Sequence, residues 1–279
     1  MIVSELIKLG STKLKSKNIQ SHVLDSEILL SEALGKSREE TLLKYDEQIK
    51  FDIEKKFKSL IQRRSSNEPI AYILNYKEFW SKRFKISKNT LIPRPETELL
   101  VDKLTKIYTN KNISILDIGT GSGCIIISLL SELKNSWGVG IDISKKAIED
   151  AQFNAEKFIS NKRVKFFKRS FYNISNVNFD LIVSNPPYIK RVDIKNLNED
   201  IKRFEPKIAL DGGNDGLDLI KKVIYKSKRF LKINGMLALE IGNEQIKKVS
   251  KILIDNNFRI VHVIKDYKNN VRCVLALNN

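Results

Sequence analysis

Apolar β-branched segments alternate with amphipathic helical segments over the second half of the chain, and this alternation constrains the fold more than any other feature. A β–α order of this kind predicts a mostly parallel sheet with helices on both faces. The predicted strands are Ile113–Ile118, Gly138–Ile141, Val164–Phe167, Phe179–Ser184, Met236–Ile241, Arg259–Ile264 and Val271–Leu277. The last two are joined by a connection too short for a parallel crossover, so they must be antiparallel. We therefore expect an α/β, Rossmann-like seven-stranded sheet with a terminal antiparallel hairpin.

Residues 1–75 show helical spacing of apolar residues and no strand pattern, which predicts a small N-terminal helical domain. Gly35 is a suitable helix end, and Ser37 with Glu40 forms a capping-box pattern that opens another helix. Aromatic and β-branched residues then predict a β-hairpin linker over residues 76–90. The α/β domain is expected to span residues 91–279.

Composition excludes several classes of protein. Two Cys rule out a disulfide framework and a four-thiolate zinc site, and with only two His we expect no metal centre. No apolar run reaches the roughly 18 residues of a membrane span, and the start of the chain lacks a signal-peptide pattern. The predicted location is therefore the cytoplasm, with no membrane association.

The chain is strongly basic, with Lys+Arg 50 against Asp+Glu 33 and a formal net charge of +17. Such a charge permits nucleic-acid binding. The basic residues are scattered rather than gathered in one stripe, however, so direct nucleic-acid binding is allowed but not expected.

A glycine-rich turn, Gly119-Thr120-Gly121-Ser122-Gly123, follows the first strand of the α/β domain and precedes a helix. Glycines let the backbone approach a ligand closely, and the helix start offers free N–H groups to an anion. The spacing is not that of the dinucleotide fingerprint. A tight turn without a ligand is the plainer alternative.

Asp142 ends the next strand, about 20 residues after the glycine turn, where an acidic group can bind ribose hydroxyls. Alone it would be only a residue at a helix start. Together with the turn it indicates an adenosine-containing ligand that is not a dinucleotide. S-adenosylmethionine fits, because its carboxylate suits the helix N-terminus and its ribose suits Asp142.

The segment Asn185-Pro186-Pro187-Tyr188 follows the strand Phe179–Ser184. Two prolines remove N–H donors and fix the backbone, so acceptors remain: the Asn185 side-chain oxygen and the Pro186 carbonyl. These match the two N–H groups of a planar amino nitrogen. The plainer alternative is a rigid turn with Tyr188 in the core.

With these motifs the sequence resembles the class I S-adenosylmethionine-dependent methyltransferases, and more closely the PrmC/HemK family of peptide chain release factor N5-glutamine methyltransferases. The resemblance also rests on Leu91–Glu98, on Glu205-Pro206 with Gly212-Gly213, and on Leu24–Leu30. It implies methyl transfer from S-adenosylmethionine to the glutamine of the release-factor GGQ motif. Release factors would be the protein partner, docked by residues 1–75, and we expect a monomer.

The resemblance also implies roles for single residues. Asn185, Pro186 and Tyr188 would be catalytic, and Asn185–Tyr188, including Pro187, would hold the glutamine. Phe171 falls where the family has an aromatic side chain near the adenine, and Ser170 stands where an acidic residue is common. The cofactor would be bound by Gly119, Thr120, Gly121, Ser122, Gly123, Asp142, Phe171 and Asn185.

Two other functions fit parts of the pattern. An adenine-N6 methyltransferase acting on DNA or RNA would use the same acceptor pair, but the sequence shows no separate target-reading domain. A protein that only senses S-adenosylmethionine would have no use for a clamp on a substrate nitrogen.

Overall fold

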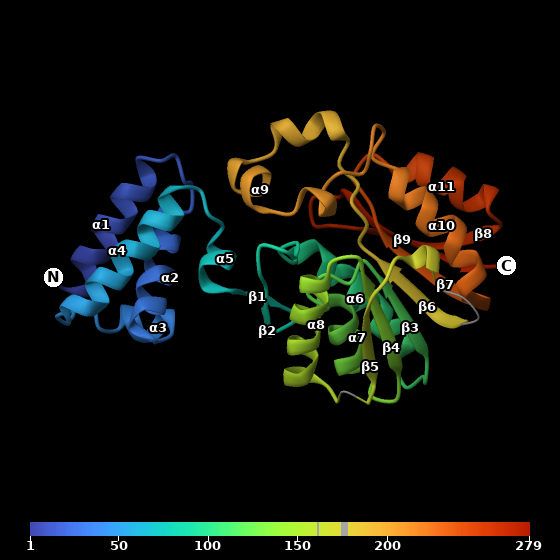
Figure 1. The fold of residues 1–279 in the computed structure, drawn as a ribbon, viewed down its shortest axis with the longest axis horizontal. Coiled ribbons are helices and arrows are strands. Elements are labelled where there is room, and N and C mark those ends of the chain that lie inside the picture. The colour runs from blue at the N-terminus through green and yellow to red at the C-terminus, as the bar shows by residue number, and fades with distance from the viewer. Residues whose placement is uncertain (161, 174–177) are drawn as a thin grey trace. The chain divides into compact units, whose positions relative to one another are not determined.

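The computed structural model describes residues 1–160, 162–173 and 178–279 (Figure 1). It divides into two compact units, Met1–Asn75 with Asn198–Phe204, and Tyr76–Leu197 with Glu205–Asn279. Across the described residues, no helix combines the length and the apolar character that crossing a bilayer requires.

The first unit is entirely helical. Its helices are α1 (Val3–Lys15), α2 (His22–Leu34), α3 (Arg38–Leu42), α4 (Phe51–Ser65), α5 (Ile70–Leu74) and α9 (Glu199–Phe204). Gly35 ends α2 with a φ of +67°, and Ser37 and Glu40 form the predicted capping box of α3. The predicted helical character is thus confirmed. α5 and α9 are too short to show a helical period in the sequence.

A buried ion pair joins two helices of this unit. The Arg64 guanidinium donates to Asp25 over 2.7 Å, and their side chains are only 10% and 6% exposed. Arg64 also donates to the carbonyl of Glu68, and the hydroxyl of Ser26 donates to that of Ile7. Part of the Leu24–Leu30 motif is therefore explained by helix packing.

We expect Arg64→Met to destabilise the helical unit by about 3–5 kcal/mol, because it keeps the apolar stem and leaves Asp25 buried without its partner. Urea unfolding followed by helical circular dichroism measures this. The control is Lys58→Met, which removes an exposed ion pair with Glu54 from the same helix and should barely move the midpoint. Equal midpoints for the two variants would contradict a stabilising role for the buried pair.

The second unit opens with the predicted hairpin, β1 (Tyr76–Phe79) and β2 (Lys82–Lys85), which pair in antiparallel fashion. Phe79 and Phe84 are buried, with their rings edge to face at 6.1 Å. The helices of the unit are α6 (Glu98–Tyr108), α7 (Cys124–Glu132), α8 (Lys145–Phe158), α10 (Asp218–Phe230) and α11 (Ile246–Asp255). The strands of the main sheet are β3 (Ser114–Ile118), β4 (Trp137–Asp142), β5 (Val164–Lys168), β6 (Phe179–Ser184), β7 (Leu231–Glu240), β8 (Phe258–Lys265) and β9 (Val271–Asn278).

The main sheet has the order β5-β4-β3-β6-β7-β9-β8. Strands β3 to β7 are parallel, whereas β9 runs antiparallel to both β7 and β8. The predicted fold class is confirmed, including the antiparallel end. Within this unit α6, α7 and α8 cover one face of the sheet and α10 and α11 the other (Figure 1). Alternate residues of each inner strand enter the two cores, as with Ile115 and Leu116 in β3.

The strand order reverses at β3, whose neighbours are β4 on one side and β6 on the other. In the register, Ile118 lies opposite both Ile141 of β4 and Ser184 of β6. The carboxyl ends of these three strands therefore meet at one point of the sheet edge. Such a switch point is where open α/β sheets bind ligands.

Candidate active site

The glycine turn leaves β3 and is fastened to the end of β4. The N–H groups of Gly119 and Thr120 both donate to the carbonyl of Ile141 over 2.9 Å. Gly119 and Gly121 have φ values of +74° and +55°, and a methyl group on either would meet no atom within 4 Å. The backbone thus borders open space that a ligand can approach closely.

Gly123, unlike Gly119 and Gly121, lies against neighbouring helices. Its φ is +79°, and a Cβ there would lie 2.8 Å from Ile127 of α7 and 3.2 Å from Ala151 of α8. This glycine therefore allows α8 to pack closely against the start of α7.

Asp142, at the end of β4, holds the turn from the other side. Its Oδ2 accepts a hydrogen bond from the N–H of Gly121 over 3.0 Å, and its Oδ1 accepts one from Ser144 over 2.9 Å. Burial raises the pKa of Asp142, against these backbone hydrogen bonds, which lower it. Each oxygen keeps a second lone pair for a ligand hydroxyl.

Asp117 is a buried carboxyl group beneath the turn, and the sequence analysis assigned it no role. Its Oδ2 accepts a hydrogen bond from the hydroxyl of Thr120 over 2.7 Å. Its Oδ1 is buried and has no hydrogen-bond partner within residues 1–160, 162–173 and 178–279. Burial raises the pKa of Asp117 to about 7. An unsatisfied buried acceptor is energetically costly.

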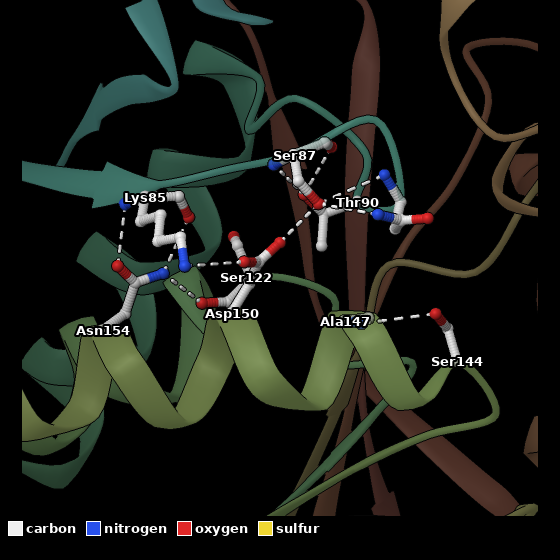
Figure 2. A network of polar contacts seen from close by, with 9 residues as sticks. Lys85, Ser87, Thr90, Ser122, Ser144, Ala147, Asp150 and Asn154 are labelled. Atoms are coloured by element: carbon white, nitrogen blue, oxygen red, sulfur yellow. Dashed lines mark hydrogen bonds and ion pairs between the residues drawn. The ribbon is translucent and has the colours of Figure 1, made fainter.

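A network of polar side chains on α8 ties the glycine turn to the chain that leaves the hairpin (Figure 2). The Asn154 side chain donates to the carbonyls of Ser122 and Lys85 and accepts from the N–H of Lys85, at 2.9, 2.9 and 2.7 Å. One turn away, Asp150 accepts from the hydroxyl of Ser87 over 2.6 Å. The segment beginning at Asn89 is thus held beside the turn.

The acceptor turn follows β6. The hydroxyl of Ser184 donates to the carbonyl of Ile118 over 2.7 Å, which fixes the exit of β6 next to the glycine turn. Beyond it, Gln245 donates to the carbonyl of Tyr188 over 3.0 Å, and the N–H of Gly212 donates to that of Ile189 over 2.8 Å. The loop is therefore held through its backbone carbonyls, which accept hydrogen bonds from Gln245 and Gly212.

One cavity of the second unit joins the two turns. The predicted residues that line it are Gly119, Thr120, Gly121, Ser122, Asp142, Phe171, Asn185, Pro186 and Pro187. Phe171 is 7% exposed and stacks on Tyr172 with ring centroids 4.5 Å apart. Gly123 and Tyr188 do not line the cavity, and the functions assigned to them stay predictions.

Two segments that carried the resemblance but had no assigned roles also contribute to the lining of the cavity. Arg94 donates to the buried carboxylate of Glu205 over 2.7 Å, which brings Pro206 beside the Leu91–Glu98 segment. Arg94, Thr97 and Pro206 all line the cavity.

A further buried carboxyl group next to the acceptor turn belongs to Glu240, the last residue of β7. It accepts hydrogen bonds from the hydroxyls of Thr97 and Tyr188. The only signal for it in the sequence is a charged residue that interrupts an apolar strand. No group of three or more potential metal ligands occurs in the part of the chain that the structure describes.

Comparisons with known proteins identify the two domains of the chain. A model of the methyltransferase domain matches residues 109–276, and one of the PrmC N-terminal domain matches residues 5–74. The ribosomal protein L11 methylase structure from Lactobacillus delbrueckii shares the fold at 18% identity, with a TM-score of 0.50 over 72% of this chain and 89% of that one. The cavity thus belongs to a methyltransferase domain.

Two relatives show to which family of methyltransferases the chain belongs. The release factor glutamine methyltransferase of Haemophilus influenzae is 38% identical over 94% of both chains. The bifunctional methyltransferase of Rickettsia prowazekii is 35% identical over 98% of this chain, which spans only 56% of that relative's length. The chain belongs to the release factor glutamine methyltransferase family, as the sequence motifs indicated.

The Asp117 carboxyl group generates a pH prediction. Its pKa is about 7 when folded and 3.8 in the reference state, so its stabilising contribution is complete below pH 4 and is lost as the pH rises to about 7. Asp117→Asn removes this titration. In ligand-free protein, the melting temperature of the variant relative to wild type should therefore rise between pH 5 and pH 7.5.

Thermal unfolding over that range measures the difference. Asp193→Asn, at an exposed position, controls for the loss of one charge. Parallel curves of melting temperature against pH for wild type and Asp117→Asn would show that burial does not hold the proton on Asp117.

Proposed function

We propose that this chain transfers a methyl group from S-adenosylmethionine to the side-chain amide nitrogen, N5, of the glutamine in the GGQ motif of peptide chain release factors. One observation carries the proposal: the acceptor turn Asn185–Pro187 opens into the same cavity as the glycine turn and Asp142. The relatives named release factor glutamine methyltransferases support the choice of substrate.

The cavity has the chemistry that this cofactor needs. Open space borders Gly119 and Gly121, and Asp142 offers acceptors to ribose hydroxyls. Phe171 supplies an apolar surface suited to an adenine ring. When bound, the cofactor supplies a methyl group made electrophilic by its sulfonium.

The protein's own contribution is to position the glutamine. An amide nitrogen is a poor nucleophile, because its lone pair is delocalised into the carbonyl group. Asn185 Oδ1 and the Pro186 carbonyl would accept its two N–H bonds and aim the nitrogen at the methyl group. Such alignment can supply several of the roughly 7–11 kcal/mol available from orientation. The same acceptors stabilise positive charge that develops on the nitrogen.

The helical unit is proposed to dock the release factor, because a single glutamine side chain exposes too little surface for selection among proteins. Large apolar side chains are exposed where α3 connects to α4: Leu43 is 86% exposed, Tyr45 49% and Phe51 80%. Exposed apolar residues of this kind suit a protein partner. The proposal places a monomeric enzyme in the cytoplasm and needs no direct contact with nucleic acid.

Labelled methyl transfer tests the function. The wild type should methylate purified release factor and leave DNA, tRNA and a release factor without the GGQ glutamine unlabelled. Asn185→Ala should lower the single-turnover rate by about a hundredfold, as loss of a preorganised contact does, and should weaken cofactor binding far less. Asp142→Ala should instead weaken cofactor binding by calorimetry.

Label on DNA or tRNA would favour the adenine-N6 alternative. A transfer rate near that of wild type in Asn185→Ala would refute the clamp. Unchanged cofactor affinity in Asp142→Ala would remove Asp142 from the cofactor site.

Docking has its own test. Leu43→Ser combined with Phe51→Ser should raise KM for intact release factor by about tenfold, because apolar anchors dominate interface energies. Cofactor affinity and transfer to a short GGQ peptide should not change. The control pairs Ile233→Ser with Tyr267→Ser, which are equally exposed on the second unit. An unchanged KM in the Leu43 and Phe51 variant would exclude this surface.

A further inference from the structure

Glu240 carries a buried carboxyl group next to the acceptor turn. It is 2% exposed and does not line the cavity, so it is not placed to touch either substrate. It also lies far in sequence from its partners, in β7, whereas Thr97 precedes α6 and Tyr188 follows β6. Burying a carboxyl group without hydrogen-bond partners costs free energy, so the partners of Glu240 are informative about its role.

Two hydroxyl groups donate to this carboxyl group. The Thr97 hydroxyl donates to Glu240 Oε2 over 2.6 Å, and the Tyr188 hydroxyl donates to Oε1 over 3.3 Å. Thr97 has one hydroxyl proton, and this hydrogen bond uses it. The Thr97 oxygen can then only accept from any further neighbour.

That neighbour is the side-chain amide of Asn185. Its Nδ2 lies 3.5 Å from the Thr97 oxygen. An amide carbonyl at this place would face an oxygen without a proton to give, so only the NH2 end fits. The Oδ1 end of Asn185 is thereby left for the cavity, which Asn185 lines.

Burial raises the pKa of Glu240 and outweighs the hydrogen bonds from Thr97 and Tyr188 and the positive charge of Arg272, which lower it. The two hydroxyls occupy both carboxyl oxygens, Thr97 at Oε2 and Tyr188 at Oε1.

We propose that Glu240 and Thr97 are positioning residues that lock the Asn185 amide with its Oδ1 toward the methyl-accepting nitrogen, an inference that rests on the proposed function. A freely rotating amide would spend part of its time with NH2 facing the substrate NH2, where two donors meet and neither is satisfied. The lock removes that state. It also favours an amino nitrogen over a carbonyl or carboxylate at the same place, because the locked turn presents only acceptors.

The kinetic test uses two substitutions of Thr97. Thr97→Val keeps the shape and removes the hydroxyl, whereas Thr97→Ser keeps the hydroxyl. Thr97→Val should lower the single-turnover rate at saturating release factor by about tenfold, with cofactor affinity within about twofold of wild type. Thr97→Ser should stay near the wild-type rate. Equal rates for the two variants would overturn the proposal.

Coupling to Asn185 separates positioning from a direct contact. In an Asn185→Ala background, Thr97→Val should cost less than about twofold, because there is no amide left to orient. A full additional tenfold loss of rate in the Asn185→Ala background would show that Thr97 acts on the substrate directly. That result would overturn the proposal that Thr97 acts by orienting Asn185. If Thr97→Val does not fold, Glu240→Gln replaces it, since a glutamine NH2 facing Thr97 frees the hydroxyl proton and unlocks Asn185.

A readout without turnover keeps the inference separate from the proposed function. The side-chain NH2 resonances of Asn185, assigned by their absence in Asn185→Ala, should exchange slowly in wild type and in Thr97→Ser and faster in Thr97→Val. Unaltered exchange in Thr97→Val would overturn the lock. A wild type that locks Asn185 yet does not methylate release factor would refute the proposed function alone.

Discussion

The hydrogen-bonded register of β4, β3 and β6 is the constraint on which the rest of the second unit depends. It sets Ile118 opposite both Ile141 and Ser184, so the three chain segments that follow these strands start from one place. The bonds from the glycine turn to Ile141 and from Ser184 to Ile118 extend the same register beyond the strands. A slip of one residue would turn side chains to the opposite face of the sheet and separate the two halves of the cavity.

The sequence predicted what depends on local pattern. The strands show as apolar β-branched runs, the antiparallel end follows from a short connection, and the glycine turn carries its signal in consecutive residues. Asp142 was found because its spacing from the turn reflects one β–α unit. Its contact with Gly121 confirms that the two lie together, while its role toward a ligand remains part of the proposal.

What the sequence did not predict depends on contacts between distant segments. Thr97 and Glu240 are separated by 143 positions, and Lys85 and Asn154 by 69. Neither Thr nor Asn stands out in a local pattern, because such residues are common at helix starts and on exposed faces. The short helix α9 was missed for another reason: it has too few residues for periodicity, and its grouping with the N-terminal helices is a property of the folded chain.

The three bonds of Asn154 have a consequence for entropy. Through one rigid amide on α8, the carbonyl of Ser122 and the backbone of Lys85 share a single point of attachment. A molecule that immobilises the glycine turn therefore also restricts the backbone at Lys85, where the chain leaves the hairpin. The conformational entropy lost at Lys85 is then shared with the binding step at the glycine turn. Two segments far apart in the chain thus lose their freedom together.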